Sequence, residues 1–279
     1  MKNKKSVMFG ALALVLLSGL SAASTTFAWF TTTRTASLTF SDATVGCSDS
    51  NLVVTYVDSL NTFGTISDEA NEIKLTGANR VTDISGNGLD FYKPVWSPIE
   101  GVATNIKEVA TAENYYIDFV LKIARQSDSP SATGIKVYLG ENTKILPVDA
   151  TKPRDVDAVS AVRMAVISYA DELRASPALI ELHAPVVETS PEYIIKDTAS
   201  TAYSVNGYKV HDASAEVNSD PFVTKLSEAD GPTHQIADLS SDSEAYVGFR
   251  FWIEGTDAEA TKDKALGGMF KVALDIYSL

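Results

Sequence analysis

Three acidic side chains near the C-terminus come closest, in type and spacing, to a metal site. Glu254, Asp257 and Glu259 lie at the end of a predicted strand and in the turn after it. Calcium takes several carboxylate and carbonyl oxygens, so these residues could hold Ca²⁺. The spacing lacks the glycine and distal glutamate of an EF-hand loop, and Gly255 supplies the backbone freedom of an ordinary turn. We expect a strand-ending turn in preference to a calcium site.

Other residues that carry chemistry are present but not grouped. The histidines, His183, His211 and His234, are not within helix or hairpin spacing of one another, which argues against a histidine-rich metal motif. The one cysteine, Cys47, cannot form an internal disulfide. No Gly-x-Ser-x-Gly or Ser-x-x-Lys element is present. We therefore expect a protein that is not an enzyme and has no cofactor, with calcium as the alternative.

The N-terminus has the layout of a secretory signal peptide. Three lysines precede an uncharged apolar run, and small residues follow at positions 21–24. Cleavage is expected after Ala23 or after Ala28, and we take residues 1–28 as the signal. The alternative is an uncleaved anchor, because the uncharged stretch is long enough to span a bilayer. The Ser, Ala and Thr residues that dilute this stretch favour cleavage and a secreted, extracellular or cell-surface location.

The charge balance limits the partners. Without residues 1–28 the chain keeps 20 basic residues against 36 acidic ones, a net charge of −16. Such a surface repels phosphate backbones and anionic lipid, so we expect no nucleic-acid partner and membrane contact only through the signal before cleavage. The remaining residues, 29–279, are enough for one domain whose core needs no disulfide.

The residues around the second cleavage position form a recognisable pattern. Trp29 and Phe30 directly follow Ala28, and a threonine-rich, β-prone run ends at Phe40. This pattern resembles the N-termini of the TasA/camelysin family of Gram-positive surface proteins. The resemblance implies cleavage just before a short aromatic start, followed by a first strand. It also implies fibre subunits of an extracellular matrix, as in a biofilm.

A second pattern lies near the C-terminus. The segments 251–257 (FWIEGTD) and 267–272 (GGMFKV) are similar to uncharacterised exported proteins of Gram-positive bacteria. In those proteins the two segments form a hairpin that closes a β-sandwich, and the resemblance implies the same hairpin in this chain.

Period-two alternation of apolar residues predicts strands along most of the chain. The clearest segments are 115–124, 134–139, 161–169, 245–253 and 269–277. We expect the first two to form a hairpin, residues 178–183 to pair near 161–169, and short helices near 103–112 and 258–266. Residues 186–243 predict a long polar excursion, with a tight turn at Asn206-Gly207. The sequence therefore predicts a mainly β protein, an antiparallel β-sandwich of jelly-roll or Greek-key type.

Two functions from different classes remain after these exclusions. In the first, Trp29, Phe30, Leu38 and Phe40 form an assembly strand that adds to the sheet of the next subunit and builds a homopolymer or joins other surface proteins. In the second, the protein's own sheet covers this strand, and the protein is a secreted carbohydrate- or ligand-binding module or adhesin.

Overall fold

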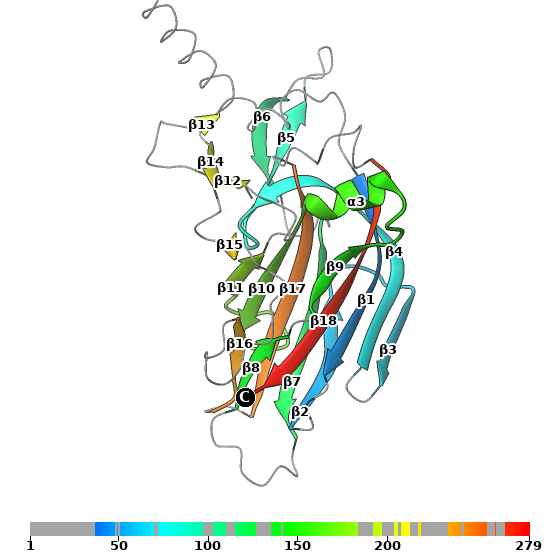
Figure 1. Ribbon diagram of the computed structural model, residues 1–279. Helices are drawn as coiled ribbons and strands as arrows, with labels where there is room; N and C mark the ends of the chain where they lie inside the picture. Colours follow the sequence, from blue (N-terminus) through cyan, green and yellow to red (C-terminus); the bar gives the residue numbers. More distant parts are fainter. Residues whose placement is uncertain are drawn as a thin grey trace, which may run out of the picture.

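The computed structural model describes most of the chain that follows the predicted signal. It covers residues 37–47, 49, 51–69, 72–96, 103–109, 115–126, 135–140, 142–183, 192–196, 204–205, 208–212, 217–218, 234–240, 243–255, 260 and 266–279. Two sheets pack face to face as a β-sandwich (Figure 1), so the predicted fold class is confirmed. In the described part of the chain, no helix is long and apolar enough to cross a membrane.

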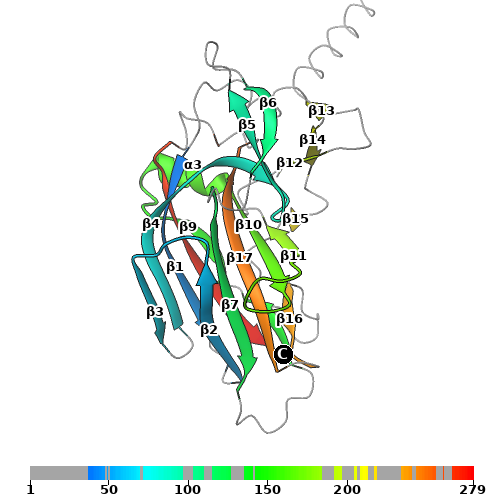
Figure 2. The ribbon, with the colours of Figure 1, turned by 180° about the vertical axis from the view of Figure 1, so that it is seen from behind.

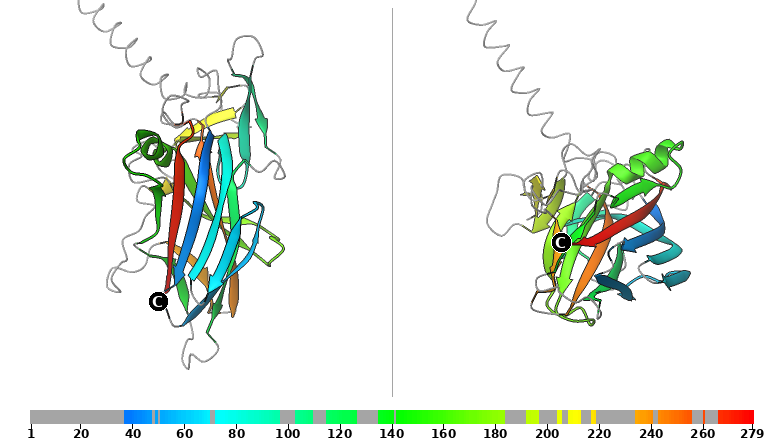
Figure 3. Two further views of the ribbon diagram at one scale, coloured as in Figure 1. Left: turned by 90° about the vertical axis from the view of Figure 1, so that its right-hand side faces the viewer. Right: turned by 60° about the horizontal axis from the view of Figure 1, so that its bottom comes forward.

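The first sheet is built around the first and the last strand of the domain. β1 lies between β4, which is antiparallel to it, and β18, which is parallel to it (Figure 3, left). β3 adds to the outer edge of β4, and β8, β9 and β16 extend the sheet beyond β18. The strands of this sheet are β1 (Ser37–Cys47), β3 (Thr65–Glu69), β4 (Glu72–Gly86), β8 (Lys136–Leu139), β9 (Lys144–Pro147), β16 (Gln235–Asp238) and β18 (Met269–Ser278).

The second sheet has the order β2, β7, β17, β10, β11, β15. The end of β4 joins this sheet as well, because it pairs with the end of β17 (Figure 2). The strands are β2 (Leu52–Ser59), β7 (Ile117–Arg125), β10 (Val162–Tyr169), β11 (Ala178–His183), β15 (Val217–Asn218) and β17 (Glu244–Glu254).

The smaller elements lie outside the two main layers. β5 (Phe91–Trp96) and β6 (Ala103–Glu108) form a hairpin at one end of the sandwich. β12 (Glu192–Lys196), β13 (Ser204–Val205) and β14 (Tyr208–Asp212) form a separate three-stranded sheet. The single described α-helix, α3 (Pro153–Ser160), begins with a proline, which suits the first turn of a helix because its missing N–H is not needed there.

Aromatic side chains from both sheets fill the space between the layers. Phe40 of β1 is fully buried and meets Phe63 and Phe270, with ring centroids 5.8 and 5.7 Å away. On the opposite sheet, Phe119 stacks on Phe249 at 5.8 Å. Each fully buried side chain of this size contributes roughly 1.5–3 kcal/mol of hydrophobic stabilisation, so these contacts hold the sandwich closed without a disulfide.

The central part of the second sheet is buried on both faces, which alternation alone did not indicate. Val120, Ile167 and Trp252 point away from the central core and belong to a second apolar cluster. Phe91 covers this cluster with its ring edge-on to Trp252 at 5.1 Å. Around Phe91 and Trp252, the outer face of this sheet is therefore a second interior, and polar groups placed there lie out of water.

Several expected pairings are wrong. β7 and β8 do not form a hairpin, because β7 pairs with β17 and β2 whereas β8 pairs with β18 and β16. The C-terminal hairpin is also absent: β17 lies in the second sheet and β18 in the first. Residues 103–108 form the strand β6 in place of a helix, and the other expected helix lies largely outside the described residues. The predicted pairing of β10 with β11 is confirmed. Val205 pairs with Tyr208, the residues on either side of the predicted turn at Asn206-Gly207.

Candidate functional site: a buried aspartate and two arginines beneath a pocket

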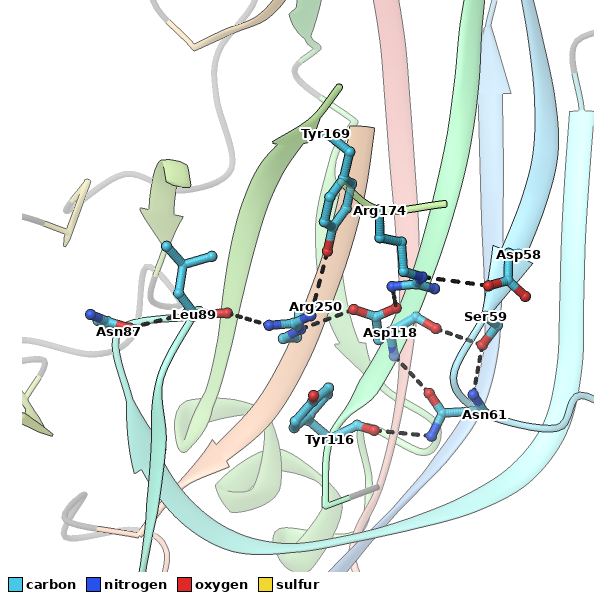
Figure 4. Close-up of polar contacts among 11 residues, drawn as sticks. Asp58, Ser59, Asn61, Asn87, Leu89, Tyr116, Asp118, Tyr169, Arg174 and Arg250 are labelled. Carbon is cyan, nitrogen blue, oxygen red and sulfur yellow. Dashed lines mark hydrogen bonds and ion pairs between the residues drawn. The ribbon is translucent and has the colours of Figure 1, made fainter. Parts of the chain in front are cut away.

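The outer face of the second sheet carries a buried polar cluster (Figure 4). Asp118 of β7 and Arg250 of β17 are directly opposite each other in the antiparallel register. Tyr169 of β10 reaches them across Gly248, where a Cβ would come within 2.5 Å of the tyrosine ring. The missing side chain at Gly248 is thus what lets three neighbouring strands bring these groups together.

Asp118 is the centre of the cluster. Its side chain is fully buried, one carboxylate oxygen accepts a hydrogen bond from Arg250 Nε at 2.9 Å, and the other accepts one from Arg174 Nη1. Its backbone is fixed as well, because its N–H donates to Asn61 Oδ1 at 2.7 Å and its carbonyl accepts from Ser59 Oγ at 2.5 Å. Both carboxylate oxygens are therefore committed to holding guanidinium groups.

Arg250 ties the sheet to the loop that covers it. Nη1 donates to the carbonyl oxygen of Gly88 at 2.7 Å, and Nη2 lies 3.4 Å from the hydroxyl of Tyr169. The guanidinium also stands over the ring of Tyr116, 4.7 Å from its centroid. Gly88 has φ +88° and packs so closely on Ala165 that a Cβ would meet its side chain at 2.5 Å, so this position requires glycine.

Arg174 enters the cluster from a loop on the other side. It has φ +64°, and Nε reaches Asp58 Oδ2 at 3.4 Å. Burial alone would lower the pKa of Arg174, but the charge and hydrogen bond of Asp118 outweigh burial and raise it. Within the described residues, its buried Nη2 makes no hydrogen bond, so one donor of this cation stays unused.

The tyrosines of the cluster act as neutral groups. Burial raises the pKa of Tyr169 and of Tyr116, against the opposing charge of Arg250. Both phenols therefore stay protonated at neutral pH and contribute polar O–H groups and ring faces beside the cations.

A pocket of about 370 Å³ opens over this cluster. It combines apolar side chains with the two arginines and a phenol, which suits a small ligand that carries acceptor oxygens. The residues that line it are Leu60, Leu89, Asp90, Tyr169, Arg174, Pro177 and Arg250.

Of the three acidic residues considered near the C-terminus, Glu254 is the one that lies among the described residues. Glu254 is fully buried and accepts a hydrogen bond from Trp252 Nε1 at 3.2 Å. It belongs to no cluster of three or more ligand-type side chains among the described residues. Asp257 and Glu259 lie outside those residues.

The predicted assembly strand is placed in part. Phe40 packs in the central core, and Leu38 pairs with Val81 in the register of β1 and β4. In the single chain, β1 thus lies within the protein's own sheet, between β4 and β18. Trp29 and Phe30 lie outside the described residues.

Comparison with known proteins adds no further site residue. No family model, no curated protein and no solved structure matches this chain. Sequence reasoning missed Asp118, Arg174 and Arg250, although two of them did leave a signal. Asp118 and Arg250 are charges with apolar neighbours on both sides within their strands, and such charges are rarely buried without a partner. Arg174 lies in a loop and left no comparable signal.

Proposed function

We propose that the protein is exported and works as a cell-surface or extracellular-matrix structural protein whose subunits assemble by exchanging β1. The observation that carries this proposal is the place of β1 in the sheet. It is the first described strand after the export signal, and it fills a slot between β4 and β18 with hydrogen bonds on both sides.

The slot is a strong binding site for a copy of the same strand. Phe40, Ala43 and Val45 each expose 1% or less of their surface. Without β1, the apolar side chains that these residues contact would be exposed to solvent. The β1 strand of a neighbouring subunit can make the same contacts. Exchange of an identical element costs little, and a head-to-tail exchange that does not close produces a filament.

Because β1 is part of the core, a deletion of the N-terminal residues does not test this form of assembly cleanly. Deleting the residues up to Phe40 would remove part of the core as well as the exchanged strand, so loss of filaments in that variant would be ambiguous. A lock that keeps β1 in its own subunit is more informative. Thr44 and Lys74 are directly opposite each other in the antiparallel register of β1 and β4, a separation of about 4.5–5.5 Å between Cα atoms that a disulfide can bridge.

We expect the double variant Thr44→Cys with Lys74→Cys to form no filaments when oxidised and to form them after reduction. The measurement is negative-stain microscopy of concentrated residues 29–279. The matched control is Leu146→Cys with Lys271→Cys, a cross-strand pair of β9 and β18 in the same sheet, which should not prevent filaments. Filaments of the oxidised β1 lock as abundant as those of the parent, or a parent that stays monomeric, would contradict the proposal.

The pocket favours a second candidate function, a secreted carbohydrate- or ligand-binding module. The observation behind it is the unused donor of Arg174 beside an opening lined by Arg250 and Tyr169. A glycan array probed with the oxidised β1 lock would test it. Arg174→Gln should weaken binding about 10- to 100-fold, whereas Lys122→Gln, an exposed cation on β7, should leave it unchanged. Equal binding by both variants would place the ligand elsewhere.

A further inference from the structure

Two histidines that are far apart in the sequence meet beside a glutamate. His183 is the last residue of β11, Glu181 stands two residues before it on the same strand, and His234 directly precedes β16. Glu181 Oε2 lies 2.9 Å from His183 Nε2 and 3.0 Å from His234 Nδ1. All three ligand-type atoms lie within 4.8 Å of one another.

His183 is the residue in this cluster that most needs a further partner. Its side chain is fully buried, and neither ring nitrogen makes a hydrogen bond of acceptable geometry within the described residues. Burial holds the pKa of His183 below its usual value, although Glu181 opposes this effect. A neutral imidazole has a lone pair that binds metals, and a buried polar atom without a partner costs about 1–3 kcal/mol.

The spacing fits an ion held between the three side chains. Zinc binds histidine nitrogen and carboxylate oxygen at about 2.0–2.1 Å, so neighbouring ligands of a tetrahedral ion stand about 3.3 Å apart. The two distances to Glu181 are within a few tenths of an ångström of this value. A small movement of the two imidazole rings would bring their ligand nitrogens to the same distance from each other.

The backbone at His234 is held in the conformation that the cluster needs. His234 has φ +59°, in the left-handed region that residues other than glycine seldom adopt. Its carbonyl oxygen accepts a hydrogen bond from Leu139 N at 3.3 Å, which fixes it to β8. Backbone strain of this kind collects at functional sites, where the surrounding structure maintains it.

We propose that Glu181, His183 and His234 bind one divalent transition-metal ion of the zinc class. Two nitrogen ligands and one oxygen ligand suit zinc, whereas calcium and magnesium take oxygen ligands only. Glu181 keeps 23% of its side chain exposed, so solvent reaches the cluster and supplies a water as the fourth ligand.

The ion would link the two ends of the segment 184–233, which makes up most of the polar excursion. His183 ends β11 in the second sheet, and His234 directly precedes β16 in the first sheet. A metal bound by both histidines therefore joins the two ends of residues 184–233 and links β11 to β16. Its role is structural and independent of strand exchange.

The test uses residues 29–279 without a histidine tag, titrated with Zn²⁺ against a colorimetric chelator and, separately, with Co²⁺. The parent should bind one equivalent, give the visible absorption of tetrahedral Co²⁺, and melt about 5–10 °C higher at 100-fold excess of Zn²⁺ over Kd. Glu181→Gln and His234→Ala should each weaken binding at least 100-fold and remove the thermal shift.

The third histidine supplies the matched control. His211 lies on β14, opposite Tyr193 of β12. His211→Ala should bind Zn²⁺ as the parent does. His183→Phe is a further check, because it keeps a ring in the buried position but removes the ligand nitrogen. This variant should also abolish the cobalt spectrum. A parent that binds no Zn²⁺ at micromolar concentration, or a His234→Ala variant that binds as tightly as the parent, would overturn the proposal.

Discussion

Replacing Arg250 by alanine should lower the free energy of unfolding by about 3–5 kcal/mol, among the largest effects of a single substitution in this protein. Arg250 is the buried partner of Asp118, and its removal leaves a fully buried carboxylate with only Arg174 beside it. The same change frees the carbonyl oxygen of Gly88 and removes the cation above Tyr116. Chemical denaturation with urea, monitored by tryptophan fluorescence, measures the loss.

Two further variants separate the buried pair from ion pairs in general. Lys122 forms an exposed pair with Glu244 on the same two strands, and Lys122→Ala should cost at most about 1 kcal/mol because solvent screens exposed pairs. The double variant Asp118→Leu with Arg250→Leu should be more stable than Arg250→Ala, since it leaves no unpaired buried charge. If Arg250→Ala were no more harmful than Lys122→Ala, the cluster would not hold the outer face together.

Replacing Trp252 by alanine should also cost about 3–5 kcal/mol. Its indole is fully buried on the outer face of the second sheet, where it meets the ring of Phe91. The substitution leaves a cavity between the second sheet and the segment that carries Phe91. It also removes the hydrogen bond that the indole N–H donates to Glu254. Thermal and urea unfolding both report this loss.

Two further variants test whether the loss of stability in Trp252→Ala comes from the size of the buried side chain. Trp252→Phe keeps an aromatic ring in the cluster but loses the N–H, so it should cost clearly less than Trp252→Ala. Leu173 is 82% exposed, and Leu173→Ala should stay within about 0.5 kcal/mol of the parent. A Trp252→Ala variant as stable as Leu173→Ala would show that the second interior is not packed as described.

Alternation predicted the main strands well because each has one face in the central core. In β18, Phe270, Val272, Leu274 and Ile276 are buried, as the period-two pattern indicates. In β17, Phe249 and Phe251 pack in the central core and Trp252 packs in the second cluster, as period-two alternation requires. Alternation could not show whether the other face of each strand, which points away from the central core, is exposed to solvent or buried.

Pairing was less predictable than strand position because hairpins were assumed between neighbours. β7 and β8 follow each other in the chain but lie in different layers of the sandwich, and so do β17 and β18. Period-two patterns carry no information about which strand lies alongside. The helix α3 was also missed, although Pro153 at its first turn and the acidic Asp155 after it are typical helix-start signals.

The clusters depend on contacts between distant residues, which a single sequence does not reveal. Asp118 and Arg250 stood out as charges in apolar strands, but nothing in the sequence identified them as partners. Glu181 and His183 alternate onto one side of β11, but the sequence alone does not single them out as a pair. His234 becomes their neighbour only through the fold, because it directly precedes β16.

The parallel pairing of the first strand with the last determines when folding can finish. Residues 39–47 need residues 269–276 as their neighbours, so almost the whole chain must be present before Phe40 is enclosed. Pairings between such distant segments form slowly. Under the export that we propose, the polypeptide would therefore cross the membrane unfolded, and the sandwich would close only after the last strand has reached the outside.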